Sequence, residues 1–153
     1  MTTENDIAQL LQTQLNNANF TLLGNPAKIK VMEWNLSRPA LFDQYLSRNN
    51  QAIVRNDVLV AVRERKSTGS RYIQTIPRTR TVEYEVAVWL LVLDPKEAPA
   101  HTVLREQVVN LVIKYFTENP KTAQFNGTFT DDHLSGRSFN FETLIMVTKT
   151  LRR

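Results

Sequence analysis

The chain has 153 residues, of which 42% are hydrophobic and 22% are charged, and it contains no cysteine. This composition is typical of one globular domain, and it excludes a disulfide-stapled scaffold, a collagen-like repeat and a chain too polar to form a core. The longest nearly apolar run, residues 86–93, is too short to span a membrane, and the acidic N-terminus is unlike a signal peptide, so we expect a cytoplasmic protein with no membrane partner.

The first third of the chain predicts one amphipathic helix and one short strand. A helix over residues 4–17 is predicted by apolar side chains at the 3.6-residue spacing, namely Ile7, Leu10, Leu11 and Leu15. Weak alternation over residues 28–34 is typical of a short edge strand. Residues 35–56 have no regular pattern and are interpreted as an irregular insert, in which Pro39 is suited to open a short helix over residues 40–46.

The middle of the chain predicts two strong strands. Val58 to Val62 is apolar throughout, as in a buried strand, and a longer strand is predicted over residues 80–93. In the first half of that strand, Glu83 and Glu85 should point to the opposite side of the sheet from the apolar residues with which they alternate. The second half of the strand is apolar on both faces. We therefore place the longer strand in the middle of a sheet, joined to its predecessor by an antiparallel hairpin whose tip, residues 66–78, projects from the body.

The C-terminal third predicts a second helix and a final strand. The buried helix is predicted from Thr102 to about Glu118, and the final strand covers residues 138–150. Between them lie an extended piece over residues 124–130 and a polar loop over residues 131–133. The fold class is thus α+β: a single domain (residues 1–153) with a mainly antiparallel sheet, two main helices on one face and a protruding hairpin.

The sequence offers little support for catalysis. All four glycines are isolated, so no phosphate-binding loop is present, and nothing resembles a nucleophile elbow. Asp131, Asp132 and His133 supply metal-ligating groups, but adjacent residues rarely aim three ligands at one ion, so a solvated loop is the favoured interpretation. His101 is interpreted as a polar residue at a helix start. We expect a protein without catalytic activity, metal or cofactor.

One local feature carries the excess positive charge. Residues 63–80 contain six basic residues and one acidic residue, Glu64, within a chain of net charge +4. Arginine and tyrosine are favoured where proteins meet, and the candidate contact residues are Arg63, Arg65, Lys66, Arg71, Tyr72, Ile73, Ile76, Arg78 and Arg80. A solvated loop, an arm in a protein assembly and a nucleic-acid-binding module are the three interpretations left open. Trp34 and Trp89 are interpreted as core residues.

The order and spacing of these elements resemble those of the tail-terminator (tail-to-head joining) proteins of long-tailed bacteriophages. The matching pieces are the helix around residues 7–15, the strand at 58–62, the long hairpin, the strand at 84–93 ending in Asp94, the helix at 102–116 and the closing strand at 138–150. The insert at residues 35–56 is longer than the family pattern.

The resemblance implies a structural role in a virion. Members of that family form a ring, usually a homohexamer, that caps the tail tube and presents a surface to the head connector. The implied partners are other copies of the chain, the tail-tube protein and the head connector protein, with possible non-specific contact to DNA in the lumen. The implied location is the host cytoplasm during assembly and then the head-proximal end of the tail.

Overall fold

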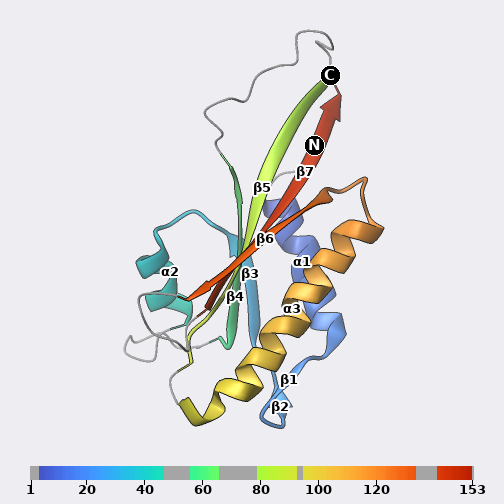
Figure 1. Ribbon diagram of the computed structural model, residues 1–153. Coiled ribbons are helices and arrows are strands. Elements are labelled where there is room, and N and C mark those ends of the chain that lie inside the picture. Colours follow the sequence, from blue (N-terminus) through green and yellow to red (C-terminus); the bar gives the residue numbers. More distant parts are fainter. Residues whose placement is uncertain (1–3, 47–55, 66–78, 93–94, 134–140, 153) are drawn as a thin grey trace.

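Figure 1 shows the computed structural model, which describes residues 4–46, 56–65, 79–92, 95–133 and 141–152. In these ranges a mixed sheet of five strands has the order β3-β4-β5-β7-β6. The strands are β3 (Ile29–Glu33), β4 (Val58–Glu64), β5 (Thr79–Leu90), β6 (Gln124–His133) and β7 (Phe141–Arg152). The helices are α1 (Glu4–Ala18), α2 (Arg38–Tyr45) and α3 (Ala98–Glu118), and a short 3-10 turn (Pro95–Glu97) precedes α3. A small antiparallel pair, β1 (Thr21–Leu22) and β2 (Asn25–Pro26), follows α1.

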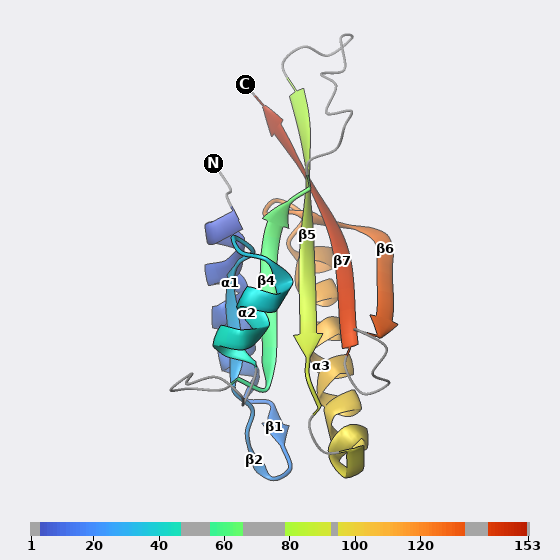
Figure 2. The same ribbon diagram turned by 90° about the vertical axis from the view of Figure 1, so that its left-hand side faces the viewer.

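Strand β5 lies in the middle of the sheet, as its doubly apolar second half predicts. Its alternate residues divide the protein into two layers, because successive side chains of a strand point to opposite faces. On one face, Val82, Tyr84 and Val86 belong to the core formed with α1 and α3. On the other face, Ala87 and Trp89 pack with residues of α2. Figure 2 shows α2 on the side of the sheet opposite α3. The predicted α+β class, with two main helices on one face, is confirmed.

The α1/α3 face holds the larger core. Ile7, Leu11 and Leu15 of α1 are almost completely buried, as are Val108 and Val112 of α3. Each such side chain contributes about 1.5–3 kcal/mol when it leaves water. Three residues of the stripe predicted for the first helix therefore fix α1 on the sheet, whereas the fourth, Leu10, is 38% exposed and does not belong to it.

Helix α2 is the short helix that was predicted within the insert at residues 35–56. Ser37 caps its N-terminus by accepting a hydrogen bond from the backbone N–H of Ala40 (3.4 Å), and Pro39 stands in the first turn, where its missing N–H leaves no hydrogen bond unmade. The expected short helix is thus present and begins two residues earlier than predicted. Residues 47–55 of the insert lie outside the described residues.

Helix α3 also begins earlier than Thr102. It starts at Ala98 and includes Pro99 in its first turn, while the Thr102 hydroxyl donates back to the Ala98 carbonyl (3.0 Å) instead of capping the helix. Proline in a first turn is compatible with a helix, and this is why the boundary was predicted too late. Within the described ranges, no helix combines the length and the apolar character needed to cross a bilayer.

Residues 131–133 are strand residues, and their interpretation as a loop was wrong. They pair with residues 141–143 of β7, and Asp131 accepts hydrogen bonds from Thr143 Oγ1 (2.8 Å) and from Arg105 Nη1 (3.0 Å). Aspartate is unfavourable in strands in general, but these two donors satisfy its carboxylate here. A register shift between Phe125 and Phe129 bends β6.

The two central antiparallel strands extend beyond the rest of the sheet. The β4 ladder ends at the pair Glu64–Tyr84, and β6 begins opposite Thr148. Beyond these points, Thr79–Val82 pairs with Lys149–Arg152, and no other described strand joins this ladder. Figures 1 and 2 show this two-stranded end of β5 and β7 standing clear of the helices. We call it the distal ribbon. The predicted β4–β5 hairpin is antiparallel, and its tip, residues 66–78, lies outside the described residues.

The outer edge of β3 is closed by a side chain of α1. The Val31 N–H donates to Gln12 Oε1 (2.8 Å), and Gln12 Nε2 donates to the Ile29 carbonyl (2.9 Å). A glutamine amide thus satisfies the backbone groups that a further strand would bind, which is one way in which proteins protect a sheet edge.

Replacing Gln12 by alanine should lower the free energy of unfolding by about 1–3 kcal/mol, because two half-buried backbone groups lose their partner. Urea denaturation checks this value. Gln9→Ala is the matched control, since Gln9 is exposed on the same helix. Equal stabilities of the two variants would show that the amide does not stabilise this edge.

Candidate protein interface on the α2 face

The nine predicted contact residues are only partly within the structure. Arg63 and Arg65 stand at the end of β4, and the backbone of Arg80 pairs with Leu151 in the distal ribbon. The side chain of Arg80 lies outside the described residues. Outside them as well are Lys66, Arg71, Tyr72, Ile73, Ile76 and Arg78. Of the basic stretch, the two arginines whose side chains are described, Arg63 and Arg65, therefore lie on the α2 face of the sheet.

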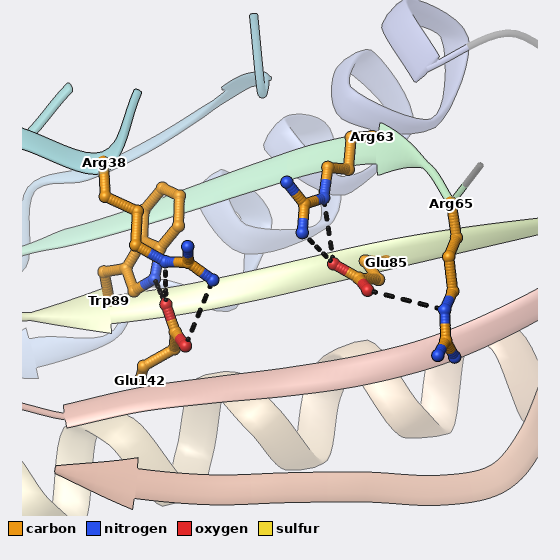
Figure 3. Close-up of polar contacts among 6 residues, drawn as sticks. All are labelled: Arg38, Arg63, Arg65, Glu85, Trp89 and Glu142. Atoms are coloured by element: carbon orange, nitrogen blue, oxygen red, sulfur yellow. Dashed lines mark hydrogen bonds and ion pairs between the residues drawn. The ribbon is translucent and has the colours of Figure 1, made fainter. Parts of the chain in front are cut away.

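Glu85 pairs with both described arginines. Its Oε2 accepts from Arg63 Nε (2.9 Å) and lies 2.8 Å from Arg63 Nη2, while Arg65 Nε lies 3.9 Å from Oε1 (Figure 3). The register explains this geometry, because Arg63 stands directly opposite Glu85 on the neighbouring strand. Glu85 was expected to face away from the apolar side of β5, and it does so.

A second carboxylate on the same face holds α2 against the sheet. Glu142 Oε2 accepts hydrogen bonds from Arg38 Nε and from the indole N–H of Trp89, each at 2.6 Å (Figure 3). Trp89 is completely buried, so its N–H needs a partner inside the protein. Arg38 is the first residue of α2. Its bond to Glu142 joins the insert to strand β7 on the same face of the sheet. The interpretation of Trp89 as a core residue is confirmed.

Trp34 connects these two polar groups. Its ring meets that of Trp89 edge to face at a centroid distance of 4.8 Å. The guanidinium carbon of Arg63 lies 3.5 Å from the Trp34 ring centroid, and that of Arg38 lies 4.7 Å from it. Trp34 is only half-buried, so it is partly a surface residue and not the pure core residue that we expected. Cation–π contacts of this kind stabilise by about 0.5–1 kcal/mol at exposed sites.

The positive groups lie outermost. The carboxylate side chains of Glu85 and Glu142 are 11% and 13% exposed, whereas those of Arg38, Arg63 and Arg65 are 39%, 40% and 54% exposed. We call Trp34, Arg38, Arg63 and Arg65 the arginine–tryptophan surface. Open hollows flank Trp34 on two sides, and exposed Leu36 borders one of them. This surface is a candidate for contact with another protein, because tryptophan and arginine carry much of the binding energy where proteins meet.

Two members of this surface were predicted from the sequence as contact residues, and the other two were not. Arg63 and Arg65 were found from the local excess of charge. Arg38 was hidden in an insert without a pattern, and Trp34 was assigned to the core from its size. The alternation of β5 already placed Glu85 on the second face, and pairing β4 with β5 would have brought it to Arg63.

The candidate metal-binding residues and His101 lie away from the arginine–tryptophan surface. Within the described ranges, no cluster of three or more metal-ligating side chains occurs. Asp131 is engaged by Arg105 and Thr143, and the side chains of Asp132 and His133 lie outside the described residues. His101 is buried, and its Nδ1 lies 2.8 Å from the Glu97 carbonyl, beside a hollow near β1 and β2. Its position in the first turn of α3 agrees with its interpretation as a helix-start residue.

Comparison with models of known protein families gives no match, and comparison with curated proteins gives none either.

Replacing Glu142 by alanine should lower the free energy of unfolding by about 1–3 kcal/mol, because the buried Trp89 N–H loses its acceptor. Arg38→Ala should cost no more than about 1 kcal/mol, since its side chain is 39% exposed and Trp89 keeps Glu142. Thermal or urea unfolding with tryptophan fluorescence measures both effects. Glu106→Ala, an exposed carboxylate on α3, is the control. A larger loss for Arg38→Ala than for Glu142→Ala would contradict this assignment.

Proposed function

We propose that the chain is a non-catalytic structural subunit that assembles with its own copies into a ring similar to that of the phage tail-terminator proteins. The ring would cap a tail tube and join it to the head connector. The α+β class, the antiparallel β4–β5 pairing and the helix order agree with the elements on which the resemblance rests.

The distal ribbon is the observation that carries this proposal. A two-stranded ribbon is at best marginally stable in water, because it has too little apolar surface to cover. Here no other described strand joins the ladder between Thr79–Val82 and Lys149–Arg152, in which Val82 is buried against the core, and Thr79 directly follows the basic residues 66–78. Such a projecting element gains stability when a neighbouring molecule covers it, as in an assembly.

The arginine–tryptophan surface supports a protein partner over a nucleic acid. Two of the three positive charges of this surface are offset, since Glu85 lies against Arg63 and Arg65, and Glu142 lies against Arg38. Neutralised guanidiniums release fewer counterions from a phosphate backbone, so they contribute less to its binding. The same guanidiniums beside an indole are well suited to a protein surface.

A ring requires a heterologous contact, in which two different surfaces of each subunit meet. The distal ribbon, together with the basic residues 66–78 that precede it in the chain, is one such surface. The outer edge of strand β6 is a second. A subunit of this kind would be made in the host cytoplasm and would end at the head-proximal end of the tail.

Light scattering and negative-stain electron microscopy of the concentrated protein, alone and with tail-tube protein, test this proposal. We expect rings with several times the mass of the 17.6-kDa chain, and six copies if the likeness extends to stoichiometry. A monomer under all these conditions would refute the proposal. If that monomer bound DNA or RNA in a salt-sensitive manner, the nucleic-acid-binding alternative would replace it.

A further inference from the structure

The two outer edges of the sheet are treated differently. Gln12 closes the β3 edge by bonding to the backbone of Ile29 and Val31. At the other edge, β6 pairs with β7 on one side, and among the described residues no strand or side chain is bonded to the outer side of Phe129–Asp131. Unpaired N–H and C=O groups on an edge are a template for a strand of another chain.

The side chains along this edge suit an extended basic partner. Phe129 is 50% exposed, which is unusual for a phenylalanine of a packed sheet, and the Asp131 side chain is 42% exposed. Over its whole length β6 contains two aspartates and no lysine or arginine. The edge therefore offers an apolar anchor, Phe129, beside the partly exposed carboxylate of Asp131, which Arg105 and Thr143 contact from within the subunit.

The chain itself contains a segment of the complementary type. Residues 66–78 contain Lys66, Arg71 and Arg78 and no acidic residue. Within them, residues 71–76 (Arg-Tyr-Ile-Gln-Thr-Ile) are rich in aromatic and β-branched side chains, which favour a strand, and Pro77 would end that strand. The segment therefore carries a charge opposite in sign to that of β6, and its composition favours a strand.

The largest distance that residues 71–76 can lie from Thr79 shows whether they can pair with β6 of their own subunit or only with β6 of a neighbour. Through β7, Phe129 lies level with Val86 and His133 lies level with Leu90. At about 3.3 Å per residue, this part of β6 lies roughly 23–36 Å along the sheet from Thr79. Ile76 precedes Thr79 by three residues and can lie no more than about 10 Å from it. Arg71, at the other end of the segment, precedes Thr79 by eight residues and can lie no more than about 28 Å from it. The segment 71–76 therefore cannot run along Phe129–His133 of its own subunit.

We propose that residues 71–76 of one subunit add as a strand to the outer edge of β6, at Phe129–His133, in a neighbouring subunit. This inference rests on the proposed ring, whose subunit contact it specifies. The contact is heterologous, because the donated segment and the accepting edge are different parts of the chain. Of the two outer strands of the five-stranded sheet, β3 is closed by Gln12, which leaves β6 as the outer strand at which strand addition extends the sheet.

Cysteine crosslinking tests the contact directly, since the natural chain has no cysteine. Thr128→Cys or Thr130→Cys on β6 is mixed with a second chain that carries Ile73→Cys, Gln74→Cys or Thr75→Cys. Opposed residues of paired strands have Cα atoms about 4.5–5.5 Å apart, within the range that a disulfide spans, and the six combinations cover both faces and the neighbouring registers. We expect a disulfide-linked dimer in at least one mixture and in none of the single variants.

Each other outcome overturns the proposal in a distinguishable way. A dimer from Thr130→Cys alone would show that β6 pairs with another β6. Rings without any crosslink in the six mixtures would refute strand addition and leave the ring proposal intact, whereas a protein that never assembles would refute both. Lys30→Cys on the β3 edge, mixed with the same arm variants, is the matched control and should give no dimer, because Gln12 occupies that edge.

Charge reversal gives an independent readout. Arg71→Glu with Arg78→Glu should weaken self-association measured by sedimentation, because the donated segment and the residue that flanks it beyond Pro77 would then meet the aspartates of β6 with like charge. The control is Lys30→Glu with Lys121→Glu, which makes the same change of net charge at exposed positions away from the proposed contact. Equal weakening of both double variants would indicate a general effect of charge and would contradict a specific contact at β6.

Discussion

The ladder between β5 and β7 is the interaction on which the rest of the structure depends. It covers the full 12 residues of β5, from Thr79 opposite Arg152 to Leu90 opposite Phe141. Because side chains alternate along it, one strand supplies the apolar face for α1 and α3 and also the face that carries Glu85 and Trp89. Its extension beyond the other strands forms the distal ribbon. Core, candidate interface and projection therefore share one register, and a slip of one residue would exchange the two faces.

The second face shows how a small protein can keep charges near its core. Glu85 and Glu142 are mostly buried, yet each meets at least one guanidinium, and Glu142 also satisfies the buried indole of Trp89. Among the described residues no buried side-chain nitrogen or oxygen lacks a hydrogen-bond partner. The cost of removing a carboxylate from water is thereby offset, and the arginines present their exposed edges to solvent. An insert that looks irregular in sequence is thus fixed on the sheet by polar contacts that also shape a surface.

The treatment of the sheet edges has a consequence for assembly. A protein with two open edges can form an unlimited sheet, which leads to aggregation. Closing one edge with Gln12 and leaving β6 accessible restricts growth to one side. The acidic and basic segments that we assign to this contact are far apart along each subunit, and this distance favours an exchange between subunits over closure within one.

The sequence by itself determined the class of the fold and the identity of its main elements. Periodic apolar residues marked the helix at 4–17 and the central strand, because a helix or strand must bury one face whatever its neighbours are. Boundaries that depend on local exceptions were missed. The second helix was predicted to begin at Thr102 although a first helical turn accepts Pro99, and Asp131 was assigned to a loop although Arg105 and Thr143 satisfy it in a strand. Only the tertiary structure placed Trp34 between Arg38 and Arg63, and Gln12 on the edge of β3. These contacts join residues distant in the chain, and a single sequence carries no record of which polar side chains meet once the strands have paired.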